Sequence, residues 1–99
     1  MDENEKWFVE RLSKPGISEA EVSGSIDALE VLLSVDALSS LVKLLGDLSR
    51  SNTIREQAAK AIYKIGANYV LKDLFELEKS ASPEIKKLVS IAMGKSGVA

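Results

Sequence analysis

The 99-residue chain contains no cysteine and no histidine. Without these side chains it lacks the usual ligands of structural zinc, haem iron and iron–sulfur clusters. It also lacks the Ser-His and Cys-His pairs that activate nucleophiles in many enzymes. We therefore expect a protein that is not an enzyme and that uses no cofactor and no metal.

Long apolar runs and a large excess of one charge are absent too. The 13 basic and 15 acidic side chains give a net charge of −2, and the isoelectric point is near 5.2. The N-terminus from Met1 to Lys6 is polar and acidic, so neither a membrane span nor a secretory signal is expected. We expect a cytoplasmic protein with one domain over residues 1–99, because 45 % apolar residues can supply an ordinary core.

Proline and glycine are scarce, and they mark where elements end. Between them, apolar residues recur at the i, i+3, i+4 and i+7 spacing of a helix, and the alternation of a strand does not occur. Capping residues predict two helices, one from Ser51-Asn52 to Gly66 and one from Ser82-Pro83 to Gly97. The remaining helices are predicted at 3–13, 18–35, 37–49 and 68–80. The fold class is therefore all-α, with six helices.

An internal repeat is the strongest signal in the sequence. A shift of 31 residues places Ile54 on Ile85, Ala61-Ile62 on Ala92-Met93, and Lys64-Ile65-Gly66 on Lys95-Ser96-Gly97. A shift of 30 places Leu41, Leu44 and Leu45 on Leu71, Leu74 and Phe75, and Ala28 on Ala58. Three units of about 30 residues follow, and such units bury a continuous core by stacking.

These residues resemble the HEAT-like repeat family, in particular its short-repeat variety found in phycobilisome lyases. The resemblance is carried by 82–87, by 54–59 and by the 61–66 ending. It implies a short right-handed solenoid of three helix hairpins, with repeats at roughly 18–50, 51–81 and 82–99. Residues 1–17 lie outside the pattern, and Trp7, Phe8, Val9 and Leu12 predict one amphipathic helix there that caps the end of the stack. It also implies that Arg55 and Lys86 hold neighbouring repeats together, although the family's preceding acidic residue is replaced by Ser51-Asn52 and Ser82-Pro83.

The second helices of the hairpins line the concave side in that family. The side of 53–66 opposite its core residues carries Glu56, Lys60 and Tyr63, and shifts of 31 and 30 extend the row to the last and first repeats. The predicted partner-binding strip consists of Ile26, Glu30, Leu33, Glu56, Lys60, Tyr63, Lys87 and Ile91. Apolar anchors within a charged rim are typical of an interface, and the alternative is that these apolar groups pack internally.

The leading functional hypothesis is a small non-catalytic scaffold that binds another protein through this strip. An accessory or lyase-like subunit that assists an enzyme is one alternative. A weak nucleic-acid binder is another, disfavoured by the acidic isoelectric point. The last helix also predicts an open end that exposes Leu88, Ile91 and Met93 and allows a homodimer. If the strip fails, the first helices around Lys43, Asp47, Lys72 and Glu76 are the next candidate surface.

Overall fold

The computed structural model describes residues 2–79 and 82–94, and within these residues the protein is all-α, as predicted. Two short 3₁₀ turns, η1 (Val35–Ala37) and η2 (Ala67–Val70), precede α3 and α5. The described residues form six helices: α1 (Glu3–Ser13), α2 (Glu19–Leu32), α3 (Leu38–Leu45), α4 (Asn52–Ile65), α5 (Leu71–Glu78) and α6 (Pro83–Ala92). In the described part of the chain, every helix is too short or too polar to cross a lipid bilayer.

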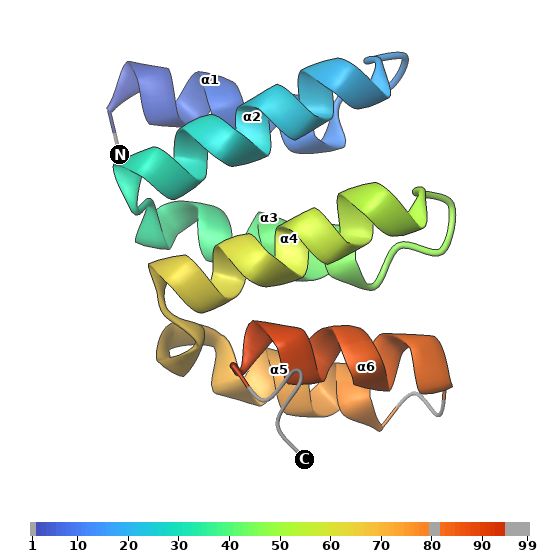
Figure 1. Cartoon of the computed structure of the whole chain (residues 1–99). Helices are drawn as coiled ribbons and strands as arrows, with labels where there is room; N and C mark the ends of the chain where they lie inside the picture. Colours follow the sequence, from blue (N-terminus) through green and yellow to red (C-terminus); the bar gives the residue numbers. More distant parts are fainter. Residues whose placement is uncertain (1, 80–81, 95–99) are drawn as a thin grey trace.

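The helices lie in three pairs, α1 with α2, α3 with α4, and α5 with α6 (Figure 1). The second helices pack side by side, with α4 between α2 and α6, and α1 also contacts α3. The longest dimension of the molecule is 38 Å. The second helices α2, α4 and α6 therefore share one face of the protein (Figure 1).

Side-chain caps set the starts of four helices. The side chains of Asp2, Ser18, Ser51 and Ser82 each accept a hydrogen bond from the backbone N–H three residues later. This bond satisfies a donor that has no partner inside the helix. The predicted starts at residues 3, 52 and 82 agree with the observed ones to within one residue because this chemistry is local.

Helix ends were predicted less well, and α2 shows why. It ends at Leu32, before the predicted residue 35, because Leu33 adopts the left-handed conformation at φ 51°. The N–H of Leu33 donates to the carbonyl of Glu30 at 3.1 Å, and the N–H of Ser34 donates to that of Leu29 at 3.1 Å. These two bonds form a Schellman motif, which usually has glycine at the left-handed position.

Three other helices are shorter than predicted. α3 begins at Leu38 after η1 and ends at Leu45, whereas the prediction was 37–49. α5 covers 71–78 of the predicted 68–80, because η2 occupies the preceding residues. α6 ends at Ala92, since Gly94 adopts φ 78° just beyond it, and the predicted terminator Gly97 lies outside the described residues.

The core extends through all three pairs and is densest around α4. Ala58, Ala59 and Ala61 are fully buried, and such small side chains let α4 approach α2, α3 and α6 closely. From α1, Leu12 is buried, and Phe8 and Val9 are partly buried against the core. Trp7 instead stays 52 % exposed.

The predicted exposed apolar end at α6 is wrong for its main residues. Leu88 and Ile91 are buried, and Met93 is partly buried against the core. The reason is that α6 packs against both α4 and α5 and turns its apolar residues toward them. A groove at this end, about 450 Å³ in volume, has mostly polar and charged walls: Glu78, Lys79, Lys86, Ser90 and Met93.

Candidate protein-binding face

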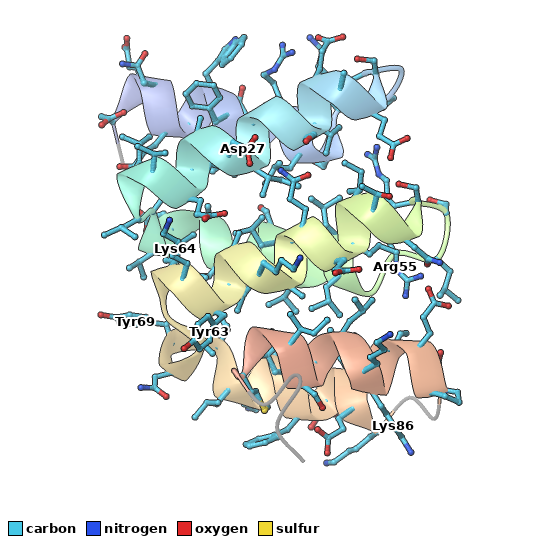
Figure 2. All side chains as sticks on the ribbon, viewed as in Figure 1. Asp27, Arg55, Tyr63, Lys64, Tyr69 and Lys86 are labelled. Atoms are coloured by element: carbon cyan, nitrogen blue, oxygen red, sulfur yellow. The ribbon has the colours of Figure 1, made fainter. Side chains whose placement is uncertain are left out.

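The face shared by α2, α4 and α6 contains most of the predicted strip. Glu56, Lys60 and Tyr63 of α4 and Lys87 of α6 are exposed. Figure 2 shows Tyr63 at the end of α4 that lies near the end of α6. Two further members of the predicted strip lie on or just after α2: Glu30 is half-buried, and Leu33, its C-cap, is 55 % exposed.

Two strip residues are not on the surface, which corrects the prediction. Ile26 is fully buried and Ile91 is 8 % exposed, so both belong to the core. The N-caps Ser18, Ser51 and Ser82 are 33 and 31 residues apart, so a shift of 30 between α4 and α2 selects the wrong side of α2. When the caps are aligned, the positions of α2 that correspond to Glu56, Lys60 and Tyr63 of α4 are Ser23, Asp27 and Glu30.

A set of polar contacts joins α2 to α4 along this face. Nε2 of Gln57 donates to the carbonyl of Ser23 at 3.0 Å and to Oδ1 of Asp27 at 2.8 Å, while the Ser23 hydroxyl donates to Oε1 of Gln57 at 2.8 Å. Nζ of Lys64 lies 3.2 Å from Oε1 of Glu30. Both N–H groups and the oxygen of the Gln57 amide are thus bonded to α2, which fixes how α2 lies on α4.

A depression of about 410 Å³ lies beside these contacts. Its lining residues are Asp27, Thr53, Glu56, Gln57 and Lys60. Glu56 and Lys60 form an exposed ion pair at 3.2 Å, which contributes little to stability and is easily exchanged for a partner's charges. Among residues 2–79 and 82–94, no three acidic side chains lie close enough to hold a metal ion. The face can supply charge and shape to a partner.

Tyr63 is the aromatic residue of the face, and its ring lies against Gly94, just after α6. It is 60 % exposed, and a Cβ built on Gly94 would overlap its ring. Only glycine allows this approach, and Gly94 also has a left-handed φ of 78°. The ring is therefore supported on one side while the rest of it faces solvent.

Arg55 joins α4 to α6 behind this face. Its side chain is 2 % exposed, with Nε donating to the carbonyl of Leu45 at 3.0 Å and Nη1 donating to Oε1 of Glu84 at 2.5 Å. Nη2 has no partner among the described residues. Arg55 thus pairs with an acidic residue of the next helix pair, Glu84. The acidic partner was expected shortly before the basic position in the sequence.

Lys86 does not share the environment of Arg55. It is exposed, makes no ion pair within the described residues, and Figure 2 shows it at the end of the molecule away from α4. The sequence equivalence of the two positions therefore does not extend to their contacts, because no described helix follows α6 to receive the Lys86 side chain.

Two carboxylates outside the face have altered acidity. A hydrogen bond from Arg11, followed by one from the Ser18 hydroxyl, lowers the pKa of Glu21. Hydrogen bonds from the hydroxyl and backbone of Ser49 lower the pKa of Asp47. Both groups are close to the solvent, and their role is to fix helix and loop ends.

Several exposed apolar residues were missed by the sequence analysis. Val31 is 80 % exposed, and Leu32, Val35 and Tyr69 are between 44 % and 68 % exposed. A signal was present, since Val31, Leu32 and Leu33 are consecutive and three adjacent residues cannot all face the core from one helix. Val31, Leu32, Leu33 and Val35 lie at the turn between α2 and α3, whereas Tyr69 lies in η2.

Comparison of the chain with models of protein families, with curated proteins and with solved structures finds no match.

Proposed function

We propose that this chain is a non-catalytic protein-binding module, a short HEAT-like solenoid whose second helices form the contact surface. The carrying observation is the exposed Tyr63 ring, which lies against Gly94 just after α6, on a face that also carries exposed charges of both signs at Glu56, Lys60 and Lys87. Aromatic anchors within a charged rim are the usual composition of binding hot spots.

The geometry behind the ring supports this role. Tyr63 meets the backbone of Gly94 rather than a flexible side chain, so the ring loses little freedom when a partner covers it. The Glu56–Lys60 pair is exposed at both ends and is available to charges of a partner. The α2–α4 contacts through Gln57 keep the neighbouring helix in position, so the surface is formed before binding.

A double variant tests the proposal. The chain with Lys60→Glu and Tyr63→Ala is compared with the wild type in affinity capture from the native lysate, followed by mass spectrometry and a binding titration with the captured partner. We expect the binding free energy to become less favourable by about 2 kcal/mol or more, as it does when hot-spot residues are truncated. Helical content and melting temperature should change little, because both side chains are exposed.

The matched control alters an equivalent pair on a first helix. Lys72→Glu with Phe75→Ala also removes one exposed lysine and one exposed aromatic ring, from α5. Equal binding by this control and the wild type is expected. Loss of binding in the control alone would move the binding surface to the first helices around Lys43, Asp47, Lys72 and Glu76.

A further inference from the structure

The two sides of α2 differ in chemistry. The side toward α4 carries polar groups that bond to it, including Ser23 and Asp27. The opposite side carries Gly24 and Val31, which are exposed, and Ala28, which is half-buried. A Cβ added at Gly24 would meet nothing within 4 Å, so this side of the helix is open.

In α4 and α6, the position that corresponds to Gly24 of α2 packs against a neighbouring helix. Alignment of the N-caps places Gly24 of α2, Gln57 of α4 and Leu88 of α6 at the same distance from their caps. Gln57 bonds to the helix before it, and Leu88 is buried in α6, which packs on α4. Val31 likewise takes the place of Lys64, which pairs with Glu30 of the preceding helix. On α2 the corresponding residue is a glycine, and no other helix of the described residues covers it.

Trp7 of α1 borders the open side. The Arg11 guanidinium lies 4.2 Å from the centroid of the Trp7 ring and donates from Nη2 to Oε2 of Glu21 at 2.5 Å. Gly24 and Ala28 follow Glu21 by three and seven residues, so all three lie along one side of α2. We call Trp7, Gly24, Ala28 and Val31 the outer face of α2.

The charge around the outer face is negative. Residues 2–33, which form the first helix pair, contain eight acidic and three basic side chains. Glu3 and Glu10 of α1 are exposed and make no ion pair within the described residues. Two copies that met through this face would bring like charges together, whereas a cationic partner would be attracted.

We infer that the outer face of α2 binds a basic amphipathic helix of a partner protein, which lies on α2 as α2 lies on α4. The small residues Gly24 and Ala28 allow a close approach of the partner's backbone, while Trp7 and Val31 contact its apolar side. Lysine or arginine side chains at its edge are placed to meet Glu3 and Glu10. This surface is separate from the face of Tyr63 and adds a second site to the proposed function.

The single tryptophan of the chain reports directly on this site. The full chain is titrated with a synthetic amphipathic peptide of leucine, alanine and lysine, and Trp7 fluorescence is recorded. Two matched peptides serve as controls, one with glutamate in place of lysine and one with the same composition in scrambled order. We expect a saturable blue shift with the first peptide, and binding at least about tenfold weaker with the other two.

Two variants locate the binding. Gly24→Gln restores the residue type found in α4 at a site with room for it and with a better helix former, so the variant folds. It should weaken peptide binding about tenfold, as should Val31→Lys, through steric and charge effects. Phe75→Lys, on α5 of the last helix pair, is the matched control and should bind as the wild type does.

Three results would overturn the inference. They are equal binding of the three peptides, a Gly24→Gln variant that binds like the wild type, and self-association in sedimentation that Gly24→Gln abolishes, which would make a second copy the occupant. None of these results depends on Lys60 or Tyr63. A failure here therefore leaves the proposed function intact, and the double variant at those two residues tests it independently.

Discussion

Nη1 of Arg55 in α4 donates a hydrogen bond to Oε1 of Glu84 in α6 at 2.5 Å, across 29 positions of the chain. The Arg55 side chain is 2 % exposed and that of Glu84 is 46 % exposed. The acid can therefore regain water if the pair is broken, whereas the guanidinium cannot. This asymmetry decides what each substitution should do.

We expect Arg55→Met to lower the free energy of unfolding by about 2–4 kcal/mol, because it leaves the Leu45 carbonyl without its partner. Glu84→Gln should also destabilise, since it removes the carboxylate charge that is bonded to Nη1 of the buried guanidinium. The double variant should cost at least about 1 kcal/mol less than the sum of the single ones. Urea denaturation measures all three. Additive losses would mean that the two groups do not interact. Lys86 is exposed, so Lys86→Met serves as a control, and its free energy of unfolding is expected within about 0.5 kcal/mol of the wild type.

Leu33→Gly should raise stability although it removes a large side chain. Leu33 has φ 51°, a conformation that costs a non-glycine residue about 1 kcal/mol, and it is 55 % exposed, so it loses little packing. The melting temperature is expected to rise by a few degrees. The neighbouring Leu32→Gly variant lies inside the helix and should lower it instead. A fall in both variants would show that contacts of the Leu33 side chain outweigh the backbone strain.

Gly94→Ala should destabilise the pairing of α4 with α6. The added methyl group overlaps the Tyr63 ring and also strains a backbone at φ 78°, so we expect a loss of about 1–3 kcal/mol by thermal denaturation. Adding Tyr63→Ala removes the overlap and leaves the strain. Partial recovery in the double variant is therefore expected, and no recovery would place the whole cost in the backbone.

The pH dependence of unfolding should contain a contribution from Glu21. Its pKa is lowered in the folded state by the hydrogen bond from Arg11 and then by Ser18. Stability from this group is thus complete above its unfolded pKa, near 4.5, and is lost as the pH falls toward the lower folded value. Glu21→Gln should make the decline in melting temperature below pH 5 less steep. An unchanged decline would assign acid sensitivity to other carboxylates such as Asp47.

The sequence predicted the features of the fold that depend on local chemistry. The caps at Ser51 and Ser82 and the glycine after α4 have the same roles in any helix, so those boundaries were placed to within one residue. The end of α2 was missed because Leu33 occupies a glycine-type conformation, and no local signal marks that choice.

The candidate face was only partly predictable. Tyr63 and Lys60 were placed on the surface correctly from helical periodicity. Ile26 was misplaced because the N-caps of α2 and α4 are 33 residues apart whereas those of α4 and α6 are 31 apart, and a fixed repeat length hides that difference. Glu84 could not be identified as the partner of Arg55 from one sequence, because their contact depends on how α6 lies on α4.

The central place of α4 also determines how the molecule opens. α4 packs against α2, α3 and α6, while α5 packs mainly against α6 and η2. Most of these contacts join helices that are adjacent or two apart in the chain, and such short-range connectivity favours rapid folding. Amide protons in α4 should therefore exchange with deuterium only through global unfolding, and those of α5 through smaller openings at the end of the molecule.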